Sequence, residues 1–235
     1  MKKTIIIAAL SAFTLVSLNS CTFVKVNRGM FEKGSSERVL PSKETKTVTY
    51  DVEQFSGIES SVAADIVYNM TMGEPSIKIE GPENYIDRIG YEVEDGVLKL
   101  SFDGRQTGGK VVITAQSETL NMLSIRGAGD FDAPYGIVTP VMDIDIQGAG
   151  DIDLKGLDCL GDVSIAVRGA GDIDISELAC QCVKVEVMGA GDVVLKGDAA
   201  SADLSIRGAG DIDITGLYVD DVKTSVQGVG SIRRK

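Results

Sequence analysis

QGAGDIDLKG, residues 147–156, combines glycines and aspartates in the manner of a phosphate-binding or calcium-binding loop. Variants of this decapeptide recur along the chain as RGAGDFDAP (126–134), RGAGDIDISE (168–177), MGAGDVVLKG (188–197), RGAGDIDITG (207–216) and, in degraded form, QGVGSIRRK (227–235). A catalytic phosphate loop is needed once, at the start of one helix, whereas a structural corner is needed in every turn of a solenoid. The repetition therefore favours an architectural role for the glycines.

The copies follow one another at a nearly constant distance. Their first glycines are separated by 21, 21, 20, 19 and 20 residues, and such a period is the signature of a repeat architecture. The segments before the glycines, such as IDIQG (144–148), alternate apolar and polar residues, as strands with one buried face do. The alternation continues in phase after the glycines, as in Ile152 and Leu154. The sequence therefore predicts a strand on each side of every glycine pair.

The inward positions of these strands are aliphatic in each copy except the last, which contains Thr224. The predicted core before the glycines is Leu123, Ile125, Ile144, Ile146, Ile165, Val167, Val185, Val187, Leu204, Ile206, Thr224 and Val226. After the glycines it is Ile152, Leu154, Ile173, Ile175, Val193, Leu195, Ile212 and Ile214.

The same alternation places both glycines of each GAG on the inner face and the alanine on the outer face. Glycine can adopt φ > 0 and has no Cβ at a crowded corner, so a turn repeated in every rung favours it. Rungs of roughly twenty residues suit a coil of two or three short strands, paired in parallel with their equivalents. Residues 121–235 are therefore predicted to form an all-β fold, a right-handed parallel β-helix or β-roll. The structural turn glycines are Gly127, Gly129, Gly148, Gly150, Gly169, Gly171, Gly189, Gly191, Gly208 and Gly210.

The preceding residues, 46–120, are predicted to form irregular rungs of the same domain, because no Gly/Ser-rich or Pro-rich linker separates the two halves. SVAADIV (61–67) reads as a degraded copy of the motif, with Asp65 at the aspartate position. PENYIDRI (82–89) is the one segment expected to be helical, since proline favours the first turn of a helix. The prediction is a single β-helical domain over residues 46–235.

The N-terminus indicates export. Residues 1–20 contain Lys2 and Lys3 and then an apolar run, as secretory signals do. LNSC (18–21) resembles the lipobox of bacterial lipoproteins, in which the cysteine is acylated, so Cys21 is the predicted lipidation site. Residues 21–45 would then be the acylated cysteine and a flexible tether. The expected location is the outer membrane, with the domain facing the periplasm or the cell surface.

Composition excludes several classes of function. The chain contains no histidine, so neither a Ser/His/Asp or Cys/His catalytic arrangement nor a histidine metal site can form. Its formal net charge of −12 argues against nucleic acid as a partner. We expect a non-enzymatic protein without a cofactor. A carbohydrate-active β-helix enzyme remains an alternative, because that fold can host outward acidic and basic residues.

Three cysteines follow Cys21. Cys159 and Cys180 lie 21 residues apart, close to one rung, and could stack within disulfide range. Their apolar neighbours favour buried thiols over a bridge, and Cys182 is left unassigned.

The lipobox, the strand-rich first half and the recurring GAGD motif resemble the putative auto-transporter adhesin, head GIN domain family, which occurs in bacterial lipoproteins and surface proteins. The resemblance covers about residues 45–235. It implies a β-helical fold and a role in adhesion, and it supplies no catalytic residue. Adhesion to a glycan or protein and service as an envelope scaffold both remain open.

The repeated aspartates are the candidate binding face. They are predicted to stack in two outward columns, namely Asp130, Asp151, Asp172, Asp192 and Asp211, and Asp132, Asp153, Asp174 and Asp213. Carboxylates about 4.8 Å apart repel by about 1 kcal/mol in water and by about 3 to 4 kcal/mol at an effective dielectric constant of about 20. Relief could come from splaying into solvent, from Arg126, Arg168 and Arg207, or from weakly held cations. A solvated acidic face is the favoured interpretation. A calcium-binding β-roll is the alternative, although such rolls repeat every nine residues or so.

Overall fold

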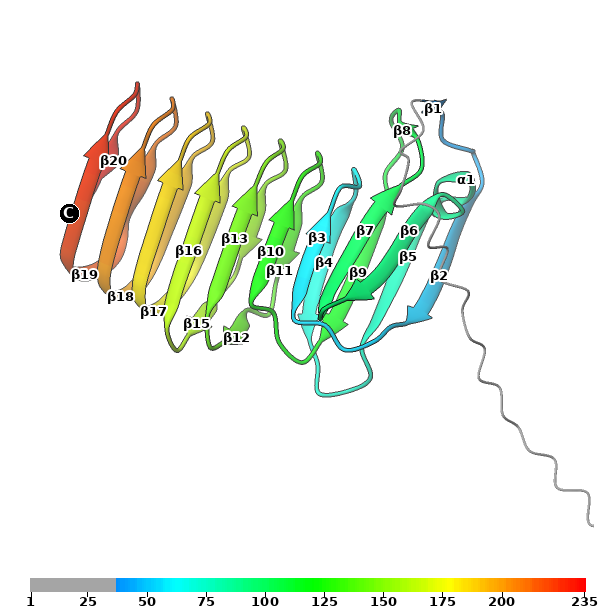
Figure 1. The fold of residues 1–235 in the computed structure, drawn as a ribbon, viewed down its shortest axis with the longest axis horizontal. Coiled ribbons are helices and arrows are strands. Elements are labelled where there is room, and N and C mark those ends of the chain that lie inside the picture. The colour runs from blue at the N-terminus through cyan, green and yellow to red at the C-terminus, as the bar shows by residue number, and fades with distance from the viewer. Residues whose placement is uncertain (1–36) are drawn as a thin grey trace, which may run out of the picture.

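The alternating segments of the repeats form strands, and the GAG glycines form the turns that join them. The computed structural model describes residues 37–235 and contains a β-solenoid of about five turns (Figure 1). Successive rungs stack along the long axis, so each strand of the repeats pairs in parallel with its equivalents in the rungs before and after it. The prediction of an all-β solenoid with rungs of about 20 residues is confirmed. The predicted signal peptide and Cys21 lie outside the described residues.

Each regular rung contributes to three parallel ladders. The front sheet consists of β7 (Val97–Phe102), β3 (Gly57–Ser60), β10 (Met122–Ile125), β13 (Met142–Ile146), β16 (Asp162–Val167) and the C-terminal segments of β17 (Ile173–Val187), β18 (Val193–Ile206) and β19 (Ile212–Val226). The back sheet consists of β9 (Val112–Ser117), β4 (Asp65–Met70), β11 (Phe131–Ala133), β14 (Ile152–Leu154), the N-terminal segments of β17, β18 and β19, and β20 (Ile232–Arg233). A short corner ladder joins them, formed by β12 (Ile137–Thr139), β15 (Leu157–Cys159) and the middle segments of β17, β18 and β19.

The core fills the space between the sheets. The predicted inward residues of the inner rungs are buried, for example Ile165 and Val187 at 1% and 0% exposure. Period-two alternation was therefore a sufficient guide to the core. The last rung differs, because Thr224 is exposed and Val226 retains 46% exposure.

Antiparallel strands close the N-terminal end of the solenoid. β2 (Thr45–Asp51) pairs with β5 (Ser76–Pro82), β5 pairs with β9, and β6 (Ile89–Glu94) pairs with β7. The rungs predicted for residues 46–120 are therefore partly a cap of reversed strands. A further small ladder joins β1 (Arg38–Val39) to β8 (Arg105–Gln106).

The predicted short helix is present as α1 (Glu83–Ile86), which begins directly after Pro82. Its Tyr85 and Ile86 are buried under the cap. Within residues 37–235, no helix has the length and apolar character needed to cross a bilayer. Val39, inside the predicted tether, is also buried, so the packed domain begins earlier than residue 46.

The GAG glycines are required for one of the two predicted reasons, the absence of a Cβ atom, and not for the other, a positive φ. None of them has positive φ. A Cβ added to Gly169 would instead meet the carbonyl oxygen of Gly148 on the preceding rung, and the same clash recurs from rung to rung. The absence of a Cβ therefore leaves space for the backbone of the neighbouring rung along the solenoid axis. It does not relieve crowding at an inner corner. The intervening alanines are exposed, as predicted.

The degraded copy SVAADIV takes its predicted place in the stack. β4 and β11 pair with Ile66 opposite Phe131, which places Asp65 beside Asp130. Val62 and Ala64 stand where later rungs have glycine, and both side chains are buried. The preceding turn, between β7 and β9, is a longer loop without the GAG motif, so no repeated carbonyl excludes these side chains.

Candidate functional site: an acidic face

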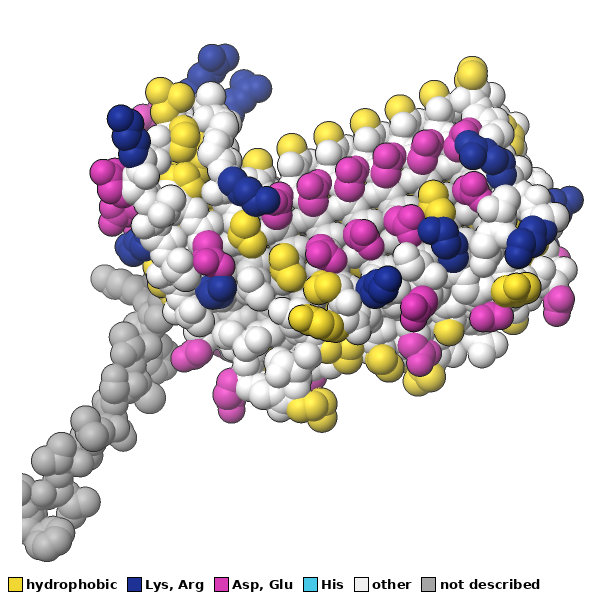
Figure 2. All heavy atoms as spheres, turned by 180° about the vertical axis from the view of Figure 1, so that it is seen from behind, with side chains coloured by type: hydrophobic (Ala, Val, Ile, Leu, Met, Phe, Trp, Pro, Cys, Tyr) yellow, Lys and Arg dark blue, Asp and Glu magenta, His cyan; other side chains and the backbone are white. Residues whose placement is uncertain are grey.

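The back sheet presents two columns of aspartates on its outer surface, which together we call the acidic face (Figure 2). The upper column, at the start of each strand, is Asp65, Asp130, Asp151, Asp172, Asp192 and Asp211. The lower column is Asp132, Asp153, Asp174 and Asp213, interrupted by Val194 between the last two. The structure thus brings together all nine aspartates that the sequence assigned to a binding face, and it adds Asp65.

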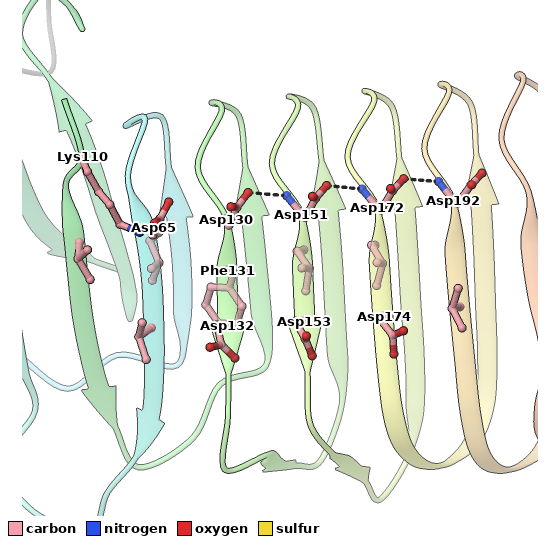
Figure 3. Close-up of a pocket in the computed structure, with 16 residues that line it drawn as sticks. Asp65, Lys110, Asp130, Phe131, Asp132, Asp151, Asp153, Asp172, Asp174 and Asp192 are labelled. Atoms are coloured by element: carbon pink, nitrogen blue, oxygen red, sulfur yellow. Dashed lines mark hydrogen bonds and ion pairs between the residues drawn. The ribbon is translucent and has the colours of Figure 1, made fainter. Parts of the chain in front are cut away.

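The upper column is held by hydrogen bonds to the backbone (Figure 3). The Oδ1 atom of Asp151 accepts a hydrogen bond from the backbone N–H of Asp172 at 2.9 Å, and Asp172 accepts one from Asp192 at 2.7 Å. The series runs from Asp130 to Asp211, whose Oδ1 accepts from the N–H of Ser231. One oxygen of each of these carboxylates therefore supports the next rung. This ladder of side-chain acceptors was not predicted, since the sequence pattern does not show which backbone groups face the column.

The predicted relief of repulsion by arginine is wrong for Arg126, Arg168 and Arg207. These side chains lie on the front sheet, where they form ion pairs with Glu59, Asp145 and Glu186 respectively. A residue that precedes the glycines lies on the front sheet, and a residue that follows them lies on the back sheet, so closeness in sequence did not mean contact.

Basic side chains contact the acidic face mainly at its ends. Lys110 pairs with Asp65 at 2.8 Å at the N-terminal end. Arg233 pairs with Asp211 at 2.6 Å at the C-terminal end. Lys196 approaches Asp174 at 3.6 Å. No salt bridge within residues 37–235 neutralises the middle of the upper column.

The local environment shifts the pKa values of three aspartates. Burial raises the pKa of Asp132, and the neighbouring charge of Asp153 raises it further. The hydrogen bond from Arg233 lowers the pKa of Asp211, and the Ser231 backbone N–H contributes to the same effect. The pKa of Asp213 is lowered mainly by hydrogen bonds from Thr215. Of these three carboxylates, Asp132 is the one whose charged form the environment disfavours.

A shallow groove of about 730 Å³ follows the acidic face from Lys110 to Asp192. Ile66, Phe131 and Ile152 lie between the two columns along this groove, with side chains that are 1% exposed and belong to the core. Within the described residues, no group of three or more histidine, cysteine, aspartate or glutamate side chains is arranged to hold a metal ion. The arrangement suits an extended ligand that carries positive charge better than it suits a single chelated ion.

The cysteines lie away from this groove. Leu157 pairs with Leu178, so Cys159 and Cys180 are neighbours on adjacent rungs, and all three described cysteines are free thiols. Burial raises the pKa of Cys180 to about 12, and the neighbouring Cys159 contributes to the rise. The free thiols agree with the prediction of no bridge, but only Cys159 is buried as predicted, whereas Cys180 is half-buried.

A protein-family model matches most of the described chain. The model of the family described as "putative auto-transporter adhesin, head GIN domain" matches residues 54–161 and 160–234. No curated protein sequence matches the chain.

Several solved structures are similar to this chain. A putative adhesin from Bacteroides fragilis NCTC 9343 is 28% identical, with a TM-score of 0.67 over 84% of this chain and 100% of that one. A putative adhesin from Parabacteroides distasonis ATCC 8503 is 21% identical, with a TM-score of 0.78 over 83% of this chain and 84% of that one. A putative lipid binding protein from the same strain is 18% identical, with a TM-score of 0.75 over 85% of this chain and 100% of that one. Because the family matches most of the chain, this protein belongs to the putative auto-transporter adhesin, head GIN domain family.

Proposed function

We propose that the protein is a non-catalytic, lipid-anchored envelope protein that binds a glycan or protein ligand through its acidic face. The observation that carries the proposal is the upper column of aspartates, whose middle members lack basic partners within residues 37–235. Stacked carboxylates repel one another, and a cationic ligand would lower that repulsion on binding. The column is also held in place, since the Oδ1 atoms of Asp151 and Asp172 each accept a hydrogen bond from a backbone N–H of the next rung.

Family membership supports a binding role over catalysis. The matched family is one of putative adhesins, and the Bacteroides fragilis protein that is 28% identical to this chain is also a putative adhesin. The acidic side chains are repeated from rung to rung, whereas a hydrolase singles out one or two carboxylates with distinct pKa values. The groove is broad and shallow, in keeping with contact along a chain and not with enclosure of a small substrate.

The test is a binding assay against immobilised extracellular glycans and proteins at low and high salt. We expect the purified protein to bind a basic or cation-bearing component, with affinity that falls as salt screens the carboxylates. The variant Asp151→Asn, Asp172→Asn, Asp192→Asn should lose most of this binding. Asparagine retains the Oδ1 acceptor, so the backbone ladder of the upper column can stay intact while its charge is removed.

A matched control carries Asp143→Asn, Asp158→Asn and Asp198→Asn. These residues are exposed on the front sheet and the corner ladder, so the control has the same net charge as the test variant with the acidic face untouched. We expect the control to bind like the wild type. If the test variant bound as well as the wild type, another surface would be responsible for recognition. If both variants lost binding equally, the loss would be due to the change in net charge and not to the acidic face.

A further inference from the structure

We propose that the front sheet carries a binding site for one neutral sugar unit, built around the hydroxyl group of Ser124. The site is separate from the acidic face, because it lies on the outer surface of the other sheet, where β3, β10, β13 and β16 run side by side (Figure 1). It therefore does not depend on the function proposed above.

Ser124 is a buried polar residue without a hydrogen-bond partner. Leu123 and Ile125 on either side of it belong to the core, so the side chain of Ser124 is directed to the outer surface of β10. The residue is nevertheless only 7% exposed, and its Oγ has no partner among residues 37–235. Most buried hydroxyl groups are hydrogen-bonded, because an unpartnered one destabilises the fold. The unused hydroxyl points to a ligand that supplies the missing hydrogen bond.

Ser124 lines a hollow of about 320 Å³ on the outer surface of the front sheet. One ion pair that lines it joins Arg126 to Glu59 at 2.7 Å, and a second joins Arg168 to Asp145. Glu59 and Asp145 are the register neighbours of Ser124 on the strands before and after it, so Ser124 lies between two carboxylates. The arginine side chains are 48% and 47% exposed, and they can adjust around a ligand that reaches the hydroxyl.

The ion pairs do not explain the hydroxyl. Along this column of the front sheet, carboxylates alternate from rung to rung with small residues. The carboxylates are Glu59, Asp145 and Glu186, and the small residues that follow them are Ser124, Ala166 and Ser205. An arginine stands two positions after each small residue and pairs with the carboxylate of the preceding rung. Because Ala166 occupies the same setting as Ser124, the pattern needs a small residue there and not a hydroxyl group.

The charges around the hollow favour a neutral ligand. Both arginines are already paired, so an added anion would compete with Glu59 and Asp145 for them. Asp143 also lines the hollow and places a further exposed carboxylate there, which repels anions. A cation would in turn meet the guanidinium groups of Arg126 and Arg168. An uncharged polar molecule has neither penalty.

A sugar ring matches this combination of groups. Guanidinium groups only donate hydrogen bonds and carboxylates only accept them, whereas each sugar hydroxyl does both. Neighbouring hydroxyls on one ring can therefore bind a donor and an acceptor of the same ion pair. Met122 and Ala166 also line the hollow and offer apolar atoms to the C–H groups of a ring. The hollow is at the small end of the range for ligand sites, so it suits one ring and not a long chain.

Titration of the purified protein with glucose, galactose, mannose and N-acetylglucosamine, followed by NMR chemical shifts, tests the proposal. We expect saturable binding of at least one sugar with a Kd on the order of 1 mM, unchanged by added salt because the ligand is uncharged. Ser124→Ala should raise this Kd about five- to tenfold, through the loss of one hydrogen bond. The same substitution should leave the melting temperature unchanged or higher, because the hydroxyl has no partner within residues 37–235.

Ser205→Ala is the matched control. Ser205 has the equivalent outward position in β18, with Arg207 two residues after it, and it does not line the hollow. This variant should bind the sugar as the wild type does. The variant Asp151→Asn, Asp172→Asn, Asp192→Asn should also keep the binding, which separates this site from the acidic face.

Three results would overturn the proposal. The first is the absence of saturable binding for all four sugars. The second is a Kd that Ser124→Ala leaves unchanged while the melting temperature falls, because the hydroxyl would then be structural. The third is tighter binding of glucuronate than of glucose, because the site would then select an anion.

Discussion

The carbonyl oxygen of Gly148 occupies the space in which a Cβ atom on Gly169 would stand. The same oxygen accepts a hydrogen bond from the backbone N–H of Ala170 at 2.9 Å. The carbonyl is thus fixed by the ladder that joins the rungs and cannot move aside without loss of that bond. This contact explains why glycine recurs with the period of the solenoid.

Gly169→Ala should therefore destabilise the domain strongly for so small a change. We expect the free energy of unfolding to fall by about 2 to 3 kcal/mol, because the added methyl group meets the backbone of Gly148 in the preceding rung. Urea unfolding followed by circular dichroism measures it. Ala170→Val is the control, with an expected change within about 0.5 kcal/mol, since Val229 already stands exposed at the equivalent position.

The position of the glycine along the solenoid should matter as well. A Cβ at Gly228 would meet the carbonyl of Gly208, but within residues 37–235 this rung has a neighbour on one side only and can shift outward. Gly228→Ala should thus lower the melting temperature less than Gly169→Ala. Equal losses at the two sites would contradict the stacking explanation.

The sequence predicted the fold well, because the information that specifies it is local and repeated. Ile144 and Ile146 alternate with aspartates in the same phase as their equivalents in every rung, so a single reading of one repeat identified the core. Similarity to the motif also located the degraded copy with Asp65. The repeats did not predict the cap, because its antiparallel strands β2, β5 and β6 have no equivalents in the repeated rungs.

The candidate site was predicted in its residues and not in its contacts. Alternation alone showed that Asp151 and Asp172 face outward on adjacent rungs. Alternation could not show that Oδ1 of Asp151 accepts a hydrogen bond from the backbone N–H of Asp172, because this contact depends on the offset between the two strands. Nor could it separate Arg168 from the column, since a sharp turn lies between them. The sequence therefore predicted which residues form the acidic face. The geometry of the strands and turns determines which hydrogen bonds and ion pairs those residues form.

The backbone ladder predicts opposite effects for two substitutions at one residue. Asp172→Ala removes the acceptor for the N–H of Asp192 and should lower the free energy of unfolding by about 1 kcal/mol. Asp172→Asn retains an acceptor and removes one repulsive charge, so stability should be unchanged or higher. Urea titrations of the two variants at low salt measure the difference. If asparagine were as damaging as alanine, the hydrogen bond would not be the source of the effect.

Asp132 should destabilise the protein at neutral pH. Its pKa is raised in the folded state, mainly by burial, so folding favours the protonated form. That contribution is absent below the ordinary aspartate pKa of about 3.9 and becomes unfavourable as the pH rises through the folded-state value. Asp132→Asn should thus melt at a higher temperature than wild type at pH 7, and the gain should vanish in acid. A gain of the same size at both pH values would point to packing instead of ionisation.

Lipid anchoring through Cys21 predicts a change of cellular fraction. Without the thiol, acylation cannot occur, so Cys21→Ser should release the chain from the membrane fraction or stall it as an unprocessed precursor. Fractionation followed by mass spectrometry of the N-terminal peptide measures both outcomes. Unchanged membrane association with an unmodified N-terminus would remove the basis for the lipoprotein proposal. Protease treatment of intact cells then tells a surface location from a periplasmic one.

Calcium should stabilise this protein no more than sodium chloride of equal ionic strength. One oxygen of each carboxylate in the upper column already accepts a backbone hydrogen bond, which leaves fewer oxygens than the six to eight or so that calcium prefers. A ligand that binds only the folded state raises the melting temperature by mass action, whereas salt only screens repulsion. Differential scanning calorimetry in the two salts separates these effects. The variant Asp151→Asn, Asp172→Asn, Asp192→Asn should respond to both salts less than wild type does, because it has less repulsion to screen. A shift specific to calcium, present in wild type and abolished in this variant, would instead establish the column as a cation site.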